Sequence, residues 1–304
     1  MGDRCKRNGT RATEVTVVSA ATPPDAVDAL LDALADRGFA CAAWEDVERG
    51  TSQVQIFLSD SSPASVRAAS AALRDAGRAL GLHLRPTTSM LPAQDWAESW
   101  KRFFHVMRAS ERVVIRPSWE LYDPRPGEVV IVLDPGMSFG TGQHATTRAC
   151  LVFLDRLAAA DARRRVLDLG CGSGILAIAA AKLGFASVAA LDNDPEAVAI
   201  ARENGALNRV AATWQVGDLA HGRRQADVVV ANILAPVLIE HAGRVTATVR
   251  AGPQAALVLS GILDSQYAAV RDAYAARGFV EQDTLLLGEW RTGLFKPVPV
   301  PAVG

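Results

Sequence analysis

Cysteine is scarce in this chain, and the cysteines that are present lie far apart. Cys5, Cys41, Cys150 and Cys171 form no Cys-x-x-Cys pair, so the sequence predicts neither a zinc site nor a disulfide framework. We therefore expect no bound metal. The same cysteine usage fits a reducing compartment, and we expect a cytoplasmic location.

The chain also lacks a long apolar run and an excess of charge of either sign. No uninterrupted apolar segment approaches about 18 residues, the length that a membrane-spanning helix needs. The first residues, MGDRCKRNGTRATE, contain no apolar core of a secretory signal. The formal net charge is −1, which gives no general basic surface for nucleic acid. We expect a monomer that neither spans a membrane nor contacts nucleic acid directly.

What the chain does have is enough length and apolar content for two packed domains. It has 304 residues, of which 49% are hydrophobic and 21% charged. This balance excludes general disorder. The length exceeds one typical domain, so we expect two.

The first domain is predicted over residues 14–88, after a flexible N-terminus over residues 1–13. Residues 14–20 have the pattern of a strand, and residues 24–37 and 63–80 place apolar side chains at helical spacing. FACAAWE and SQVQIFLS read as two strands, and LHLRPT as a last short one. The order β-α-β-β-α-β is typical of a ferredoxin-like α+β domain. Such a fold by itself assigns no function.

Residues 89–112 are predicted to form a linker helix rich in aromatic side chains. Trp96 and Trp100 are four residues apart and share one helix face, with Phe103 and Phe104 one turn further on. Such a face usually packs in a core or between domains. A platform for a substrate is the alternative.

Residues 113–304 alternate strand and helix patterns and predict an α/β domain with a parallel, doubly wound sheet. Short apolar strands such as RRVLDLG and ADVVVAN precede helical segments such as SGILAIAAAKLG and APVLIEHAGRVTATV. The last two runs, VEQDTLLLGEW and RTGLFKPV, lie close enough to form a hairpin.

The strongest motif is VLDLGCGSG, residues 166–174, where a strand turns into a helix. Asp168 lies near the strand end, and Gly170, Gly172 and Gly174 allow a ligand to approach the backbone closely. Asp192 ends the next strand, where a carboxylate can accept hydrogen bonds from both hydroxyls of a ribose. Together these residues predict a site for a cofactor that contains adenosine.

The acid inside the strand end, Asp168, favours S-adenosylmethionine over a dinucleotide. Asp168 would repel a pyrophosphate, whereas S-adenosylmethionine carries an ammonium and a sulfonium group. Nicotinamide sites prefer G-x-G-x-x-G/A. Here the glycines read G-x-G-x-G, although Gly172, Gly174 and Ala177 fit the looser form.

Asn232 follows the apolar strand in VVVANILAP, at the edge of the sheet where ligands bind in open α/β folds. Its amide oxygen can accept a hydrogen bond from an amine and orient it. A helix N-cap for the segment that starts near Pro236 is the structural alternative.

These motifs together resemble those of a bacterial family, the methyltransferases of the eleventh large-subunit ribosomal protein. The matching stretches are DWAESWKRFFHVMRASERVVIRPSW, LDPGMSFGTGQHATT, VLDLGCGSGILAIAAAKLG, ALDNDPEAVAIARENGALN, ADVVVANILAPVL and LSGIL. The resemblance implies a Rossmann-like, seven-stranded methyltransferase domain behind a ferredoxin-like domain that holds the ribosomal protein. It implies transfer of methyl groups from S-adenosylmethionine to lysine side-chain or N-terminal amines of that protein.

The resemblance also assigns residues. Thr147, Gly170, Asp192 and Asn232 would line the cofactor pocket, and Phe139 and His144 would lie at the mouth of the active site. We therefore expect Asn232, His144 and Phe139 on the catalytic side, and Thr147, Asp168, Gly170, Gly172, Asp192 and Asn232 around the cofactor. His144 is a candidate base, but a hydrogen-bonding role is equally open, and water could carry the proton.

One departure and three alternatives remain open. The family usually reads Thr-His-Pro-Thr-Thr where this chain has Gln143 to Thr147, and the missing proline removes a preset φ at a helix start. The chain could methylate another protein or a small molecule. It could be an NAD-dependent oxidoreductase, although no Tyr-x-x-x-Lys motif accompanies the loop. It could also be a binding module without activity.

Overall fold

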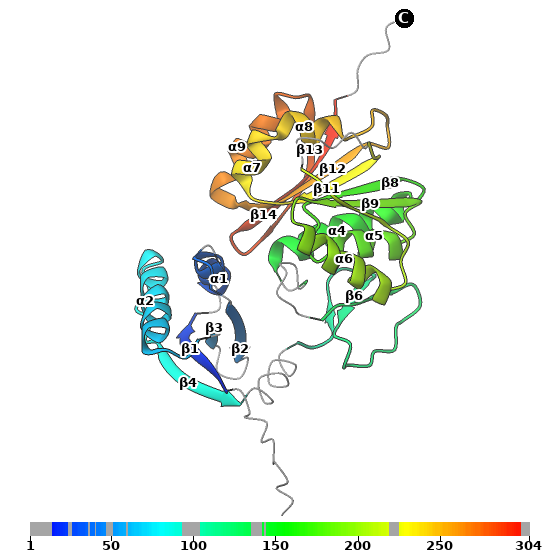
Figure 1. Cartoon of the computed structure of the whole chain (residues 1–304). Coiled ribbons are helices and arrows are strands. Elements are labelled where there is room, and N and C mark those ends of the chain that lie inside the picture. Colours follow the sequence, from blue (N-terminus) through cyan, green and yellow to red (C-terminus); the bar gives the residue numbers. More distant parts are fainter. Residues whose placement is uncertain are drawn as a thin grey trace, which may run out of the picture. The chain divides into compact units, whose positions relative to one another are not determined.

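The chain divides into two compact units, Met1–Phe104 and His105–Gly304 (Figure 1). The computed structural model describes residues 14–23, 26–35, 37–39, 41–46, 51–58, 60–92, 104–134, 142, 144–218 and 225–298. Helices and sheets occur in both units, so the predicted mixed α/β class is confirmed. In these described ranges, no helix is long and apolar enough to cross a membrane.

The first unit is a four-stranded antiparallel sheet with two helices. Its strands have the order β2-β3-β1-β4, and Val18, Leu30, Ile56 and Leu73 are fully buried in its core. The elements are β1 (Glu14–Thr22), α1 (Val27–Ala35), β2 (Cys41–Asp46), β3 (Thr51–Leu58), α2 (Pro63–Ala79) and β4 (Thr87–Pro92).

The last strand of this unit lies later in the chain than the sequence predicts. LHLRPT, residues 82–87, was expected to form it, but β4 begins only at Thr87 and pairs with β1. Leu82 and Leu84 pack against the core of the unit instead. The apolar residues of this segment indicated that it is buried, but they could not distinguish a buried connection from a strand.

The prediction of a linker helix over residues 89–112 is wrong at both ends of that range. β4 continues to Pro92, and Met107–Arg108 form a short strand, β5. The tryptophans at positions 96 and 100 and the phenylalanine at position 103 lie outside the described residues. The aromatic face of the helix therefore stays a prediction.

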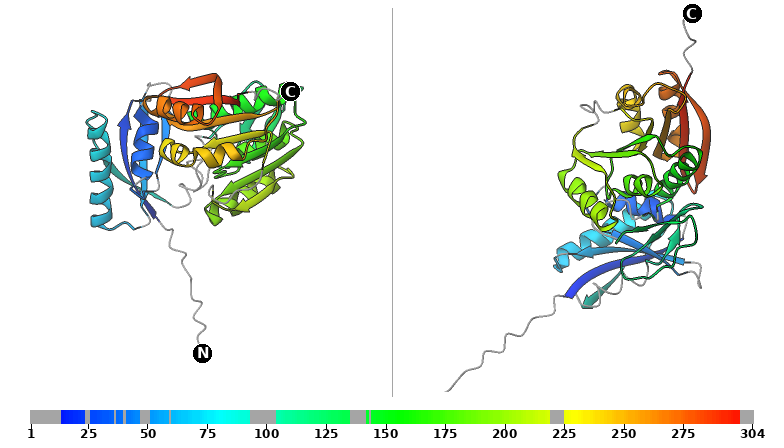
Figure 2. Two further views of the ribbon diagram at one scale, coloured as in Figure 1. Left: turned by 90° about the horizontal axis from the view of Figure 1, so that it is seen from above. Right: turned by 90° about the vertical axis from the view of Figure 1, so that its right-hand side faces the viewer.

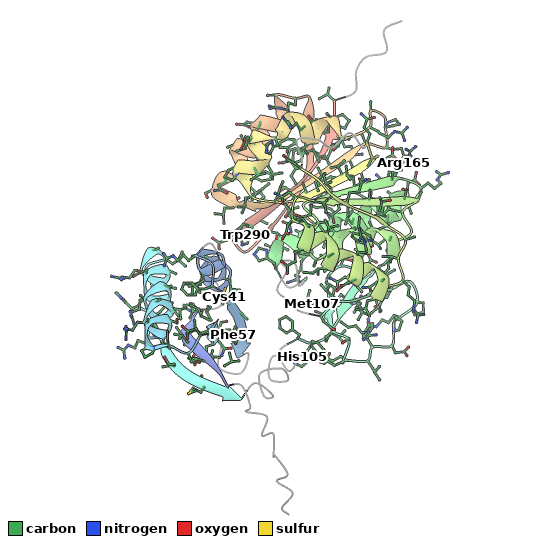
Figure 3. All side chains as sticks on the ribbon, in the orientation of Figure 1. Cys41, Phe57, His105, Met107, Arg165 and Trp290 are labelled. Atoms are coloured by element: carbon green, nitrogen blue, oxygen red, sulfur yellow. The ribbon has the colours of Figure 1, made fainter. Side chains whose placement is uncertain are left out.

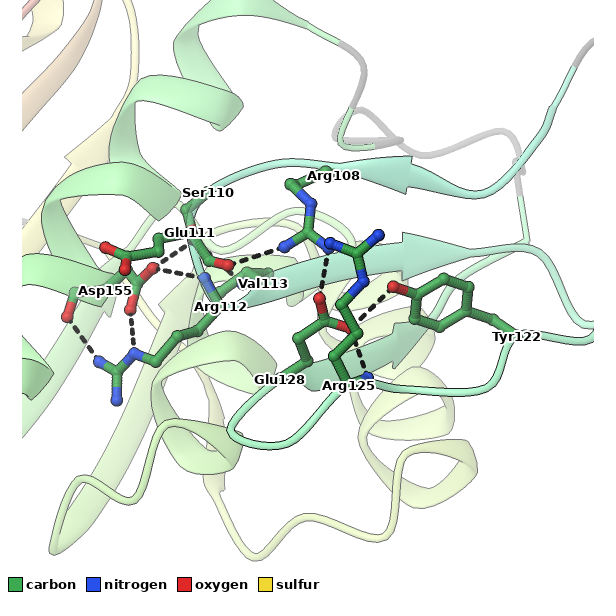
Figure 4. A network of polar contacts seen from close by, with 9 residues as sticks. All are labelled: Arg108, Ser110, Glu111, Arg112, Val113, Tyr122, Arg125, Glu128 and Asp155. Carbon is green, nitrogen blue, oxygen red and sulfur yellow. Dashed lines mark hydrogen bonds and ion pairs between the residues drawn. The ribbon is translucent and has the colours of Figure 1, made fainter.

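The second unit begins with a small three-stranded sheet that is separate from the main sheet. β5 pairs antiparallel with β6 (Val113–Arg116), and β6 pairs parallel with β7 (Val129–Val132). Two polar networks hold it (Figure 4). In one, Glu128 pairs with Arg108 and accepts a hydrogen bond from Tyr122.

The second network attaches this small sheet to the helix α4 (Ala145–Ala160). The carboxylate of Asp155 accepts hydrogen bonds from the Ser110 hydroxyl at 2.6 Å and from the backbone N–H of Arg112 at 3.0 Å (Figure 4). The Arg112 guanidinium adds an ion pair at 2.6 Å. The turn between β5 and β6 is thus fixed to α4.

The main sheet has seven strands in the order β10-β9-β8-β11-β12-β14-β13. Figure 2 shows the ribbon from two further directions. β10 to β12 are parallel, β14 runs antiparallel to β12, and β13 and β14 form the predicted hairpin. The strands are β8 (Arg165–Leu169), β9 (Ser187–Asp192), β10 (Thr213–Val216), β11 (Val228–Asn232), β12 (Ala256–Leu263), β13 (Phe279–Leu287) and β14 (Trp290–Pro297).

Helices cover both faces of this sheet, and each face has its own core. α4, α5 (Ile175–Lys182) and α6 (Pro195–Leu207) contribute side chains to one core, which includes Phe153 and Ile178. α7 (Ala235–Glu240), α8 (Ala242–Ala247) and α9 (Asp264–Ala275) contribute to the other, which includes Leu238 and Tyr274. The single helix expected over residues 235–249 is therefore two helices.

The strand directions define the edge at which the site is built. Arg165 is the first residue of β8, and Trp290 is the first residue of β14, which runs the opposite way (Figure 3). Trp290 therefore lies at the edge where the parallel strands end. Ligands of open α/β sheets bind at that edge.

Candidate active site

The glycine loop after β8 has a backbone that only glycine tolerates well. Gly170, Gly172 and Gly174 have φ of 71°, 50° and 81°. A Cβ at Gly170 would lie 2.5 Å from the side chain of Ile233, and one at Gly174 would lie 2.9 Å from Ala201. Gly174 is the N-cap of α5 and has no side chain to bond the first N–H groups. The Ala177 N–H bonds the Asp168 carboxyl, and the N–H groups before it in the first turn can serve a ligand.

Asp192, at the end of β9, accepts one backbone hydrogen bond from this loop and one from its own segment. Its Oδ2 accepts from Gly172 N–H at 2.9 Å, and its Oδ1 accepts from Asp194 N–H at 3.0 Å. An ionised carboxylate has about four acceptor positions. Asp192 is therefore oriented and keeps capacity for a pair of hydroxyls.

Asp168 is a fully buried carboxyl beneath the same loop. Its Oδ2 accepts a hydrogen bond from Ala177 N–H at 3.1 Å. Its Oδ1 has no hydrogen-bond partner among the residues that the structure describes. Burial raises the pKa of Asp168 to about 7, with the charge of Asp192 adding to the rise and the Ala177 hydrogen bond opposing it. The site is thus suited to a proton or to a cationic group.

The raised pKa predicts a stability change in the variant Asp168→Asn. An unfolded aspartate ionises near pH 3.8, so the folded protein binds the extra proton up to about pH 7 and loses stability as the pH rises between these values. A shift of about three pKa units corresponds to about 4 kcal/mol, part of which the unpartnered amide would offset. Denaturant unfolding at pH 8 should therefore find Asp168→Asn more stable by about 2 kcal/mol.

Asp155→Asn is the matched control for this prediction. Burial raises the pKa of Asp155, but hydrogen bonds from Ser110 and Arg112 and the Arg112 charge outweigh burial, so its pKa is lowered. A carboxyl with a lowered pKa stabilises the fold above the unfolded pKa. Asp155→Asn should therefore destabilise the protein at pH 8. A loss of stability in both variants would contradict the assignment for Asp168.

Asn232 lies at the end of β11, as the sequence predicts. Its Nδ2 donates to the Thr147 hydroxyl at 3.4 Å. Its buried Oδ1 has no partner among the described residues. The helix-cap alternative is wrong, because Leu234 is the N-cap of α7. The glycine loop touches the same segment, since Gly170 packs against Ile233.

The start of α4 lies next to Asn232, because Thr147 belongs to its first turn. His144 is the N-cap of α4, and its Nδ1 accepts a hydrogen bond from Thr146 N–H at 3.3 Å and lies 2.6 Å from the Thr146 hydroxyl. Ser260 donates to the Thr146 carbonyl at 3.2 Å and contacts the Thr292 hydroxyl at 2.6 Å. The helix start is thus fixed to β12 and β14, with Ala145 as the first residue of α4.

The structure brings most of the predicted site residues to one edge. Asp168, Gly170, Gly172 and Asp192 form one connected group. Asn232 and Thr147 form another, which meets the first at Gly170 and Ile233. Phe139 lies outside the described residues, as does Gln143, so their placement remains a prediction.

Sequence reasoning missed Trp290 and the polar residues that fix α4. The indole of Trp290 lies 5.1 Å from the ring of His144 at an interplanar angle of 65°. It is 7% exposed. No local motif points to Trp290 as a site residue. The only signal is its position just after Gly288 at the tip of the β13–β14 hairpin, which lies at the edge of the sheet where the parallel strands end.

The hydrogen-bond acceptors of the site fit S-adenosylmethionine better than a dinucleotide. Asp168 Oδ1 and Asn232 Oδ1 are buried acceptors without partners in the described part of the chain, and Asp192 is a third acceptor with capacity left. Acceptors suit an ammonium, a sulfonium and ribose hydroxyls, whereas they would repel a pyrophosphate.

Comparisons with known proteins find matches that are methyltransferases. The family model described as "Ribosomal protein L11 methyltransferase (PrmA)" matches residues 18–296. A ribosomal protein L11 methyltransferase of Geobacter metallireducens is 46% identical over 211 residues, which are 69% of each chain. That of Chloroflexus aurantiacus is 43% identical over 230 residues, 67% of this chain and 69% of the relative.

A solved structure is also similar. The crystal structure of a ribosomal protein L11 methylase from Lactobacillus delbrueckii subsp. bulgaricus superposes with a TM-score of 0.58 at 33% identity. The match covers 64% of this chain and 99% of that chain.

Proposed function

Because the chain belongs to the ribosomal protein L11 methyltransferase (PrmA) family, we propose that it transfers methyl groups from S-adenosylmethionine to lysine side-chain or N-terminal amines of ribosomal protein L11. The chain is a methyltransferase, and its cofactor is S-adenosylmethionine. The observation that carries the acceptor class is the Asn232 amide oxygen, a buried acceptor without a partner in the described residues. An amine has the hydrogen-bond donor that this atom needs.

We assign the two units the roles that the sequence suggested. Residues 113–304 are a Rossmann-like, seven-stranded methyltransferase domain, and residues 14–88 are a ferredoxin-like domain that holds the protein substrate. The division of the chain between Phe104 and His105 supports two separate bodies. We propose further that the enzyme is a monomer and does not contact nucleic acid.

Each cofactor residue has a distinct task. Gly170 and Gly172 let the cofactor approach the backbone closely, and Asp192 accepts hydrogen bonds from its ribose hydroxyls. Asp168 offers a carboxylate oxygen to the cationic amino-acid end of the cofactor. Thr147 holds the Asn232 amide in place. When bound, the cofactor supplies an activated methyl group, already reactive because it sits on a sulfonium.

Asp192→Ala should weaken S-adenosylmethionine binding by about 1–3 kcal/mol, the range for a hydrogen-bond partner that carries charge. The change removes the acceptor for the ribose, and it also leaves the Gly172 N–H without its bond. Isothermal titration calorimetry measures the effect. Asp192→Asn, which keeps an acceptor oxygen, should lose less affinity than Asp192→Ala, and equal affinity in all three proteins would disprove the role.

The protein's remaining task is to present a neutral, aligned amine. A lysine with a pKa near 10.4 costs roughly 4–5 kcal/mol to deprotonate at neutral pH. Desolvation in the site and the nearby positive charge lower that cost. His144 Nδ1 is already engaged with Thr146, so we assign His144 an orienting role, and the proton leaves to water. Positioning can supply up to about 7–11 kcal/mol of the barrier.

A second candidate is the same chemistry on another protein or a small molecule. The aligned parts of two relatives cover 69% and 67% of this chain, so about a third of the chain has no counterpart in those two alignments, and a different substrate would be recognised there. The oxidoreductase and the inactive binding module have no support in these matches.

Mass spectrometry of purified L11 after incubation with the enzyme and S-adenosylmethionine tests the proposal. We expect added methyl groups that map to amines, and no addition to L11 whose amines have been acetylated. A parallel reaction with the remaining ribosomal proteins identifies any other substrate. Methylation of those proteins in place of L11 would favour the second candidate.

A further inference from the structure

Helix α6 carries two buried or half-buried asparagines one turn apart that the proposed chemistry does not use. Asn204 lies in the last turn of α6, and Asn208 is its C-cap. Asn204 Nδ2 donates to the carbonyl of Ser173, inside the glycine loop, at 2.9 Å. Asn208 is 6% exposed, and its side chain bonds a different element. The two amides thus attach one helix to two parts of the molecule.

Asn208 binds β7 in the way that a neighbouring strand would. Its Oδ1 accepts from Val132 N–H at 2.8 Å, and its Nδ2 donates to the Val132 carbonyl at 2.7 Å. The same Nδ2 donates to the Asn204 carbonyl at 2.9 Å. A continuous chain of hydrogen bonds therefore runs from Ser173 through α6 to β7.

Close packing around α6 makes the middle of this hydrogen-bonded series rigid. A Cβ on Gly205 would lie 2.6 Å from the indole of Trp214, and a Cβ on Gly174 would lie 2.9 Å from Ala201 of the same helix. The glycine loop, α6 and β10 thus approach as closely as glycine permits. A displacement of α6 would therefore move the glycine loop with it.

β7 is connected in turn to the start of α4. β6 and β7 pair in register, with Ile115 opposite Ile131. A Cβ on Gly142 would lie 2.5 Å from Ile115 and 2.9 Å from Ile175 at the start of α5. Gly142 is two residues before His144, the N-cap of α4. The small sheet therefore supports the helix that presents Thr147 to Asn232.

We propose that Asn204 and Asn208 are positioning residues with separate effects, an inference that rests on the proposed function. Asn204 fixes the glycine loop and acts on cofactor affinity. Asn208 fixes β7, and through β6 and Gly142 it sets the position of the start of α4 relative to Asn232, so it acts on turnover. Neither side chain touches the reacting amine.

The test compares Asn204→Ala and Asn208→Ala in the full-length enzyme. Loss of one such hydrogen-bonded group corresponds to about three- to tenfold in an equilibrium or rate constant. We expect Asn204→Ala to raise the Kd for S-adenosylmethionine by about three- to tenfold with kcat at saturating cofactor little changed. We expect Asn208→Ala to lower kcat by about the same factor with a smaller change in Kd.

Thr248→Ala is the matched control, because it removes another buried side chain that bonds a backbone carbonyl. Thr248 is 3% exposed and donates to Val245 at 2.7 Å, at the end of α8. It should lower the melting temperature without changing Kd or kcat. If Asn208→Ala does not fold, Asn208→Ser, which retains a hydroxyl but cannot bond both groups of Val132, replaces it.

Hydrogen exchange gives a readout that needs no protein substrate. Asn208→Ala should accelerate exchange in the first turn of α4, residues 145–148, whereas Asn204→Ala and Thr248→Ala should not. If the parent enzyme transfers no methyl group to L11, the proposed function fails, and the titrations and exchange data still decide the positioning roles. Equal shifts of Kd and kcat in both variants, or unchanged exchange in α4, would overturn the inference.

Discussion

Deletion of residues 1–92 is expected to abolish methyl transfer to ribosomal protein L11 while S-adenosylmethionine binding is retained. The deletion removes β1 to β4 together with their own core around Val18, Leu30 and Ile56. The two cores of the second unit consist of other residues. A specific recognition surface contributes several kcal/mol, and each 1.4 kcal/mol is about tenfold, so kcat/KM for intact L11 should fall by at least about 10²-fold.

A short peptide with the first residues of L11 separates recognition from chemistry. The peptide lacks the part of L11 that the first unit would hold, so the full-length and truncated enzymes should methylate it at similar rates. Calorimetry with S-adenosylmethionine and a thermal melt show whether the truncated protein is folded. Unchanged kcat/KM for intact L11 in a folded truncated enzyme would show that the first unit does not hold the substrate.

The parts of the site that the sequence predicted are those set by local rules. The positive φ of Gly170 and Gly174 and the position of Asp192 follow from a strand, a glycine turn and the spacing to the next strand end. Asn232 was found for the same reason, because an apolar strand ended directly before it. These features depend on a few neighbouring residues, so the local sequence is enough to predict them.

The features that the sequence missed depend on contacts between distant residues. Trp290 meets His144, 146 positions earlier in the chain, only because β14 pairs with β12 and α4 starts beside them. The small sheet of β5, β6 and β7 stands apart from the main one because Asp155 and Asn208 hold it from two helices. Its apolar runs alone could equally have joined the main sheet.

The break between α7 and α8 has a similar origin. Residues 235–249 have a continuous helical pattern, yet the helices change at His241, which is the C-cap of one and the N-cap of the other. Leu238 and Val245 are both buried against the sheet and α9. Tertiary packing therefore outweighs local propensity at this point.

Asn232→Ala is expected to lower kcat by roughly 10²–10³-fold, by analogy with the loss of other preorganised hydrogen-bond groups. The Asn232 Oδ1 is buried without a partner among the described residues, and Nδ2 is held by Thr147 at 3.4 Å. An incoming amine that donates to Oδ1 has its nitrogen lone pair directed away from the amide. This alignment matters most in the transition state, so kcat should fall more than cofactor affinity.

Two matched variants decide whether the amide oxygen is responsible. Asn232→Asp keeps an acceptor at the same place, so it should retain more activity than Asn232→Ala, although it lacks the Nδ2 group that donates to Thr147. Thr147→Val removes the hydroxyl that fixes the amide while Asn232 stays, and we expect a smaller loss in kcat because the oxygen can still accept. Single-turnover rates at saturating S-adenosylmethionine, with calorimetry on each variant, separate chemistry from binding.

If Asn232→Ala stays within about threefold of the parent in kcat, with fold and cofactor affinity intact, the amide does not orient the amine. Because Leu234 already serves as the N-cap of α7, that result would leave Asn232 with only its bond to Thr147, and His144 beside Trp290 would be the next group to test as the one that orients the amine.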